Sequence, residues 1–133
     1  MKKLSAIILF LFLSLLYSPS WSETQTMDDL VERNDLYYKK FTDVPFTGEI
    51  TGKEKGSFKD GMRTGEWIAY WDNGQLDSKG EYKDGKKEGE WFSYTYNGNL
   101  YSKGKYKNGN KVGEWVVYWE NGQLLEKKEY KNG

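Results

Sequence analysis

Three glutamates recur at a regular interval and are the first residues of the chain to suggest chemistry. Glu66, Glu90 and Glu114 are equally spaced along the chain, and each stands between a glycine and a tryptophan. Two carboxylates about 5–10 Å apart can act as acid and base in a glycosidase, provided that their environments separate their pKa values. Copies in a regular repeat have like environments. We therefore expect solvated charges at strand entrances rather than an acid–base pair or a calcium-binding ladder.

Histidine and cysteine are both absent from the chain. This excludes nucleophile systems of the Ser-His-Asp and Cys-His kinds, and it removes the commonest zinc ligands. Without cysteine there is no disulfide, and no thiol at a cleavage site to carry a lipid. We expect a protein that is not an enzyme, with no catalytic residues, no metal site and no cofactor.

The glutamates belong to a block that is written three times. The phrases GEWIAYWDNG, GEWFSYTYNG and GEWVVYWENG are parts of 24-residue blocks that start at Lys59, Lys83 and Lys107 and align without a gap. A fourth block starts at Lys131. Because a regular period of this length is typical of repeat architectures, we expect three repeats and the start of a fourth in residues 59–133.

Each block carries two turn signals with strand-forming residues between them. The Asn-Gly pair inside each block favours a type I′ hairpin turn, whose two central residues have positive φ. The intervening residues are rich in Trp, Tyr, Phe, Val and Ile, and no 3.6-residue period appears after residue 23. We expect an all-β fold, an elongated single-layer antiparallel sheet of stacked β-hairpins, with strands at 67–71 and 76–82 and at the matching positions of the later blocks. The residues expected to form the structural repeat are Gly65, Trp67, Tyr70, Asn73, Gly74, Gly89, Trp91, Tyr94, Asn97, Gly98, Gly113, Trp115, Tyr118, Asn121 and Gly122.

The aromatic columns admit two uses. Side-by-side hairpins at ~4.8 Å per strand place the three tryptophans of the GEW phrases about 10 Å apart in a row, which would supply the core of a thin sheet. The same kind of ring could stack on sugars or enclose a quaternary ammonium group. Thr95 interrupts one tryptophan column, which argues against a small-molecule site used once per block. The candidate binding face consists of Trp71, Trp119, Tyr82, Tyr106 and Tyr130.

The N-terminal segment, residues 1–22, has the pattern of a secretory signal peptide. Lys2 and Lys3 precede an apolar run of about 15 residues, and small residues at Ser20 and Ser22 favour cleavage after Ser22. The run is shorter than the ~18–20 residues of a spanning helix, and a retained anchor is the alternative. We expect an exported protein, periplasmic or extracellular. Two segments would separate the signal peptide from the repeats, a flexible lead at 23–29 and degenerate hairpins or repeats at 30–58.

The charge balance and the last strand indicate which classes of binding partner to expect. Without Lys2 and Lys3 the chain has 18 basic and 20 acidic residues, a formal charge of −2, which does not provide the basic excess of a nucleic-acid-binding face. Lysine columns such as Lys79, Lys103 and Lys127 could meet anionic lipid head groups or act as solvated charges that deter edge pairing. The last strand, near 124–130, would offer an unpaired edge to a client protein or to a second copy of the chain.

The repeated pattern resembles MORN-type repeats of the bacterial variant class. The family pattern D-G-K-x-x-G-x-W-x-x-Y-x-x-N-G-x-L appears as DGKKEGEWFSYTYNGNL from Asp84 to Leu100. The phrase VPFTGEI, from Val44 to Ile50, followed by such repeats is similar to proteins labelled YwqK-family antitoxins. The resemblance implies a twisted single-layer sheet of stacked hairpins and a protein-interaction or phospholipid-binding role.

Taken together, these features lead us to expect a non-enzymatic exported repeat protein. It would act as a protein-interaction module in the cell envelope, with an antitoxin- or immunity-like role and a toxin as the candidate partner. Two alternatives stay open. One is a cell-wall module that binds glycan or choline with its aromatic rows, and the other is a module that binds anionic phospholipid.

Overall fold

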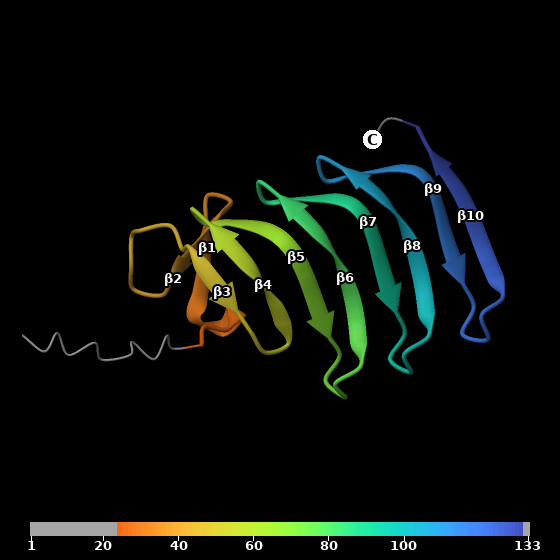
Figure 1. Ribbon diagram of the computed structural model, residues 1–133, viewed down its shortest axis with the longest axis horizontal. Helices are drawn as coiled ribbons and strands as arrows, with labels where there is room; N and C mark the ends of the chain where they lie inside the picture. Colours follow the sequence, from red (N-terminus) through yellow and green to blue (C-terminus); the bar gives the residue numbers. More distant parts are fainter. Residues whose placement is uncertain (1–23, 132–133) are drawn as a thin grey trace, which may run out of the picture.

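The protein, described by a computed structural model over residues 24–131, consists almost entirely of antiparallel β-strands. Strands β3 to β10 form one sheet in which neighbours in space are neighbours in sequence, while β1 and β2 pair separately. Figure 1 shows the eight strands side by side in a twisted ribbon. The expected sheet of stacked hairpins is confirmed, and the expected signal peptide lies outside the described residues. The elements are η1 (Met27–Asp29), β1 (Leu30–Arg33), β2 (Leu36–Lys39), β3 (Gly48–Ile50), β4 (Glu54–Lys59), β5 (Met62–Tyr70), β6 (Leu76–Lys83), β7 (Lys86–Tyr94), β8 (Leu100–Lys107), β9 (Asn110–Tyr118) and β10 (Leu124–Tyr130).

Each repeat contains two different turns, and type I′ geometry occurs at the other turn from the one expected. The pairs with two positive φ values begin at Asp60, Asp84 and Asn108, with φ of 50°, 49° and 49°. In the turns at Asn73-Gly74, Asn97-Gly98 and Asn121-Gly122 only the glycine has positive φ, 83° at Gly74. Gly74 N–H donates to Trp71 O at 2.9 Å, and the Asn73 side-chain oxygen accepts from the Gln75 amide. This longer loop is typical of a type I turn followed by a glycine bulge, so the type I′ assignment was wrong there.

A glycine inside each long strand produces a bend. Gly65, which precedes the strand expected at 67–71, lies within β5 at φ 67°, and Gly89 in β7 and Gly113 in β9 have φ of 69° and 63°. The register of β5 against β4 jumps at this point, so that three residues of β5 lie opposite Gly56 alone. Other L-residues are strained in this left-handed region, so glycine is the residue that fits. The bulge turns the following tryptophan onto one face of the sheet.

A ladder of aromatic rings on that face forms the core. Trp67, Trp91 and Trp115 are 3%, 7% and 7% exposed. Phe58 and the tyrosines at or next to the ends of β6, β8 and β10 (Tyr82, Tyr106 and Tyr130) alternate with them, and successive ring centroids lie 5.1 to 6.5 Å apart in edge-on contacts. Such pairs contribute about 0.5–1.5 kcal/mol each beyond the area they bury. We call this side of the sheet the aromatic face.

Each indole lies flat on a glycine of the preceding strand. A Cβ built on Gly80 would lie 2.2 Å from the Trp91 ring, far inside van der Waals contact, and Gly104 has the same relation to Trp115. The Trp91 indole N–H donates to Glu81 O at 3.1 Å. This glycine column is therefore required by close approach and not by backbone φ.

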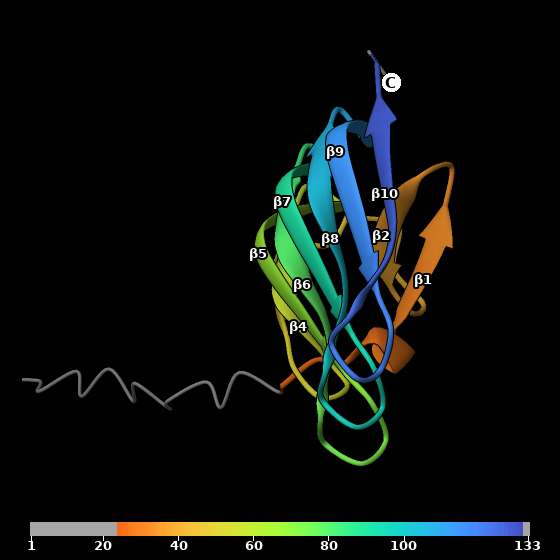
Figure 2. The same ribbon diagram turned by 90° about the vertical axis from the view of Figure 1, so that its right-hand side faces the viewer.

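The first hairpin covers one end of the aromatic face. Figure 2 shows β1 and β2 standing beside the sheet on one side of it. Tyr37 in β2 and Phe46 contact the Phe58 ring at centroid distances of 5.0 and 5.6 Å. Tyr37 N–H donates to Gly61 O, and Gly61 N–H donates to Phe46 O, both at 2.8 Å. The hairpin is thus held by backbone hydrogen bonds as well as by buried rings.

The segment expected as a flexible lead is attached to the sheet from residue 24 onward. Gln25 O accepts a hydrogen bond from Thr51 N–H at 2.9 Å, and the short helix η1 follows. The Asp29 carboxylate accepts from the Thr26 amide and hydroxyl, and these bonds lower the pKa of Asp29. Between residues 24 and 131, no helix has the length and apolar character needed to cross a membrane.

Candidate functional site

Three basic side chains lie on the aromatic face in a row, one per long strand. Each is stacked on the tryptophan four residues later, and each also lies 5.1 to 5.6 Å from the next tyrosine of the ladder. Contacts of this kind contribute about 0.5–2 kcal/mol, more when water is excluded. The cation-to-centroid distances are 4.9 Å for Arg63 on Trp67, 4.2 Å for Lys87 on Trp91 and 4.3 Å for Lys111 on Trp115. We call Arg63, Lys87 and Lys111 the cation row.

The type I′ turns hold the backbone of the cation row in place. Gly85 N–H donates to Arg63 O at 3.0 Å, and Gly109 N–H donates to Lys87 O at 2.9 Å. Each turn therefore fastens onto the basic residue of the preceding long strand. Because the turn and the basic residue recur with the same period, the row is positioned by rigid backbone and not by the flexible side chains alone.

The electrostatic surroundings change along the row. The Arg63 guanidinium lies 3.8 Å from the Glu54 carboxylate and 4.9 Å from the Tyr37 ring of the first hairpin. Among the described residues no carboxylate forms an ion pair with Lys87 or Lys111. Burial lowers the pKa of Lys87, and the like charges of Arg63 and Lys111 lower it further. The later part of the row thus has positive charge without a partner.

Two hollows open on the aromatic face beside the row. One, of about 190 Å³, is lined by Trp67, Tyr82, Lys87 and Trp91 among others. The second, of about 250 Å³, lies two repeats further on, where its lining includes Trp115, Tyr130, Lys111, Glu126 and Lys128. Both combine ring surface with a lysine and a carboxylate, Glu54 in the first and Glu126 in the second, which suits an apolar side chain inside the hollow.

The five residues expected on one binding face divide between two places. Tyr82, Tyr106 and Tyr130 are rungs of the ladder, and burial raises the pKa of Tyr82 and of Tyr106. Trp71 and Trp119 lie instead just beyond β5 and β9, at the hairpin ends, where they are 36% and 54% exposed. The three tyrosines therefore belong to the core of the aromatic face, whereas the two tryptophans lie at exposed hairpin ends.

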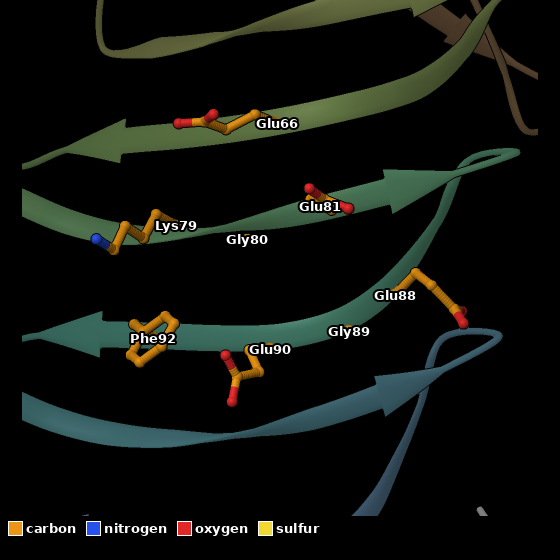
Figure 3. A pocket seen from close by; sticks show the side chains of 8 residues that line it. All are labelled: Glu66, Lys79, Gly80, Glu81, Glu88, Gly89, Glu90 and Phe92. Carbon is orange, nitrogen blue, oxygen red and sulfur yellow. The ribbon is translucent and has the colours of Figure 1, made fainter.

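The opposite face carries the glutamates. Figure 3 shows a hollow of about 370 Å³ over β5, β6 and β7, lined by Lys79, Phe92 and four glutamates, Glu66, Glu81, Glu88 and Glu90. Glu66 and Glu90 are exposed, as is Glu114, which pairs with Lys127 at 2.7 Å. Over residues 24–131 no cluster of acidic, histidine or cysteine side chains has the arrangement of a metal site.

The sequence reasoning singled out other lysines than those of the cation row. Lys79, Lys103 and Lys127, on the short strands, alternate with the glycine column and so lie on the opposite face. The signal that could have found the row was present, since a basic residue stands four positions before the tryptophan of every GEW phrase. Alternation agrees with this signal, because the basic residue and the tryptophan are an even number of positions apart, and the bulge at the intervening glycine inserts two extra residues and so keeps them on one side.

The last strand departs from the glycine column. Gly56, Gly80 and Gly104 are followed in this column by Lys128 of β10. Lys128 Nζ lies 5.0 Å from the centre of the Tyr130 ring, on the aromatic face. A further tryptophan could not lie flat on β10 as the others do, because a Cβ now occupies the place of the glycine hydrogen.

Comparison with known protein families agrees with this geometry. Residues 63–84, 87–108 and 111–132 each match the family model described as the MORN repeat variant. Comparisons with curated proteins and with solved structures gave no match. MORN repeats often act as protein- or lipid-binding modules. The three matched segments coincide with β5–β6, β7–β8 and β9–β10, and the chain therefore contains three tandem repeats of the MORN repeat variant.

Proposed function

We propose that this protein is a non-enzymatic interaction module that binds a partner protein on the aromatic face. The observation that carries the proposal is that the first hairpin covers one end of that face and leaves the other end uncovered by polypeptide in the described residues. The first hairpin contacts Phe58 and Arg63, whereas the rings of Trp91, Tyr106 and Trp115 are overlaid by two lysine side chains without acidic partners. Aromatic and basic side chains together are typical of protein-binding surfaces.

The proposed place of action is the cell envelope. Residues 1–22 have the three-part pattern of an export signal. An exported repeat module without histidine or cysteine suits binding better than catalysis, and an immunity-like role against a toxin is the specific form that we propose. The similarity of the segment Val44–Ile50 to that of antitoxin-labelled proteins supports this form.

Crosslinking in cells that produce the full chain tests the proposal. A photo-reactive residue placed at Tyr101 or Ser102, which line the second hollow, should crosslink to one defined protein of the envelope. The same residue at Glu90, on the opposite face, is the matched control and should give no such product. A defined product from Glu90 alone would place the partner on the opposite face, and no product from any of these positions would contradict the proposal.

A second candidate is binding to anionic phospholipid, favoured by the unpaired lysines of the aromatic face. Lys87, Lys111 and Lys128 lie on one side of the sheet, and each lysine near an anionic membrane contributes about 1 kcal/mol. Vesicles that contain phosphatidylserine should then bind the protein more weakly as salt is raised. Absence of binding at low salt would remove this candidate.

A further inference from the structure

The unpartnered half of the cation row indicates what kind of segment the aromatic face accepts. Lys87 and Lys111 stand on the rings of Trp91 and Trp115 with their lysine stems covering aromatic surface. Lys87 is half-buried between two like charges, and burial together with those charges lowers its pKa. A carboxylate that displaces water from this position and neutralises the lysine would stabilise its charged form, since charge-assisted hydrogen bonds are about twice as strong as neutral ones.

The first hairpin of the protein shows how polypeptide lies against this row. At Arg63 it supplies the Tyr37 ring on the outer side of the guanidinium, while Glu54 of the sheet supplies a carboxylate. Nε of Arg63 is buried and has no hydrogen-bond partner among the described residues. The same aromatic ladder continues under Lys87 and Lys111, but neither the outer ring nor the carboxylate does. A partner segment on these two lysines would extend an interface that the chain already makes with itself.

We propose that Lys87 and Lys111, with the rings beneath them, bind an extended acidic segment of a partner polypeptide that crosses the strands. This inference rests on the proposed function and names the chemistry of the partner. Strands spaced ~4.8 Å apart put equivalent residues of successive repeats about 10 Å apart. A segment in the extended polyproline II conformation advances ~3.1 Å per residue with three residues per turn, so its side chains three residues apart lie on one side, about 9 Å apart. The segment therefore carries carboxylates three residues apart, with an apolar side chain between them for the hollow beside Trp115.

Two features favour polypeptide over a lipid surface at this row. Viewed along the stack, the β1–β2 hairpin projects from the sheet on the side of the aromatic face, so a flat bilayer would meet the hairpin before it reached Lys87 (Figure 2). The second hollow also holds Glu126 in its lining, and this carboxylate disfavours an anionic group of any kind inside that hollow, whether it belongs to a lipid or to a peptide. An extended chain can place an apolar side chain there and keep its acids at Lys87 and Lys111.

The test uses the full chain and a defined probe. The probe is a fluorescent peptide of four Glu-Thr-Tyr triplets, and its control has the same composition with the glutamates adjacent. We expect the triplet peptide to bind in a salt-dependent manner and more tightly than the rearranged one. The Lys87→Met/Lys111→Met variant, which keeps the apolar stems over the rings, should lose about ten-fold or more in affinity, the size expected when charge pairs are removed.

Matched variants separate this role from a structural one. Lys79→Met/Lys103→Met removes the same charge from the opposite face and should keep the wild-type affinity to within about two-fold. Circular dichroism of each variant shows whether it is folded, and the single variant Lys111→Met, at an exposed position, serves if the double variant is not. Equal affinity of the two double variants, or equal affinity for both peptides, would overturn the proposal.

Two further outcomes separate the inference from the proposed function. If Lys87→Met/Lys111→Met still yields the crosslinked envelope partner at wild-type level, the proposed function stands and the acidic-segment inference is wrong. If this variant instead loses binding to phosphatidylserine vesicles while the wild-type protein ignores the peptide, the row is a lipid contact and the inference is likewise wrong.

Discussion

The two ends of the aromatic ladder both combine stacked rings with a cation, but the rings and cations have different neighbours. At the end formed by β4 and β5, Phe58 is 2% exposed beneath Tyr37 and Phe46, and Arg63 has both an aromatic cover and a carboxylate nearby. At the β9–β10 end, Lys111 is exposed and the ladder stops at a half-buried Tyr130. The comparison shows that the repeats supply the aromatic core and the cation row, while the β1–β2 hairpin determines which part of the aromatic face is covered.

The largest expected effect comes from removing one ladder ring at each end. Phe58→Ala should lower the free energy of unfolding by about 3–5 kcal/mol, because it leaves a cavity among Tyr37, Phe46 and Trp67. Tyr130→Ala, at the matching position of the third repeat, should cost only about 1–2 kcal/mol, because its ring is half-buried and contacts Trp115 alone among the rings. Urea denaturation of both variants measures the difference. Equal losses would show that the hairpin cover adds no stability.

The glycine column gives the next largest effect. Gly104→Ala should cost about 1–3 kcal/mol, because the new Cβ would lie 2.2 Å from Trp115 and force the indole off the sheet. Lys128→Gly, in the same column of β10, should cost no more than about 1 kcal/mol, the usual penalty for glycine in a strand. Thermal unfolding followed by tryptophan fluorescence compares them. A mild Gly104→Ala would mean that the indole does not need the glycine beneath it.

Hydrogen bonding of the indole N–H favours a later tryptophan of the ladder, Trp91, over the more buried Trp67. Trp67 is the most buried of the three tryptophans, but its N–H is buried without a partner among residues 24–131, whereas the Trp91 N–H donates to Glu81 O. Trp91→Phe should therefore cost about 0.5–1.5 kcal/mol more than Trp67→Phe, the net value of one hydrogen bond. Denaturation midpoints at equal slope measure this difference. The reverse order would show that burial outweighs the bond.

The smallest effect is a pH dependence of Lys87. Its pKa is lowered in the folded protein by burial and by the neighbouring cations, so the unfolded chain binds the proton more tightly than the folded one. Stability of the wild type relative to Lys87→Met should rise as the pH increases from the lowered value of the folded state towards the ordinary lysine value. The melting temperatures of both proteins between about pH 8 and about pH 10 give this difference.

Ionisation of other groups bears on the same measurement. Burial raises the pKa of Tyr82 and of Tyr106. Their contribution to stability therefore decreases when the pH rises above the ordinary tyrosine pKa, and this decrease is the same in the wild type and in Lys87→Met. The exposed pairs of Lys53 with Asp72 and Lys127 with Glu114 raise the pKa of each lysine and titrate at higher pH. A difference that stayed constant with pH would contradict the lowered pKa of Lys87.

Much of the structure of the repeat could be predicted from its amino-acid sequence. The Trp67 column was expected in a row and lies in one, because aromatic residues that recur once per block in a chain of strand pairs have few other places to go. The turn types could not be assigned in the same way. Asn-Gly favours type I′ in a two-residue loop, but the loop at Asn73 is longer, and an Asx bond to Gln75 accommodates a type I turn there.

The binding face was harder to predict than the core. The candidate binding face grouped Tyr82 with Trp71, whereas the structure stacks Tyr82 between two buried indoles and leaves Trp71 at a hairpin end. The packing of Tyr82 could not be predicted from one strand, because its contacts are with tryptophans of two neighbouring strands. Arg63 and its equivalents were missed because the lysines of the short strands were considered instead, although alternation places Arg63 on the same side as Trp67.

The sequence by itself determined the β-hairpin unit, its regular period, the aromatic core and the absence of histidine and cysteine, since these depend on local propensity and residue type. Only the tertiary structure decided which lysines share the aromatic face and where the first hairpin lies. Both depend on contacts between residues of different strands, since each lysine also contacts a tyrosine of the next strand and the hairpin packs on Phe58, and no local pattern specifies these contacts. That arrangement leaves Lys87 and Lys111 as the open part of the face.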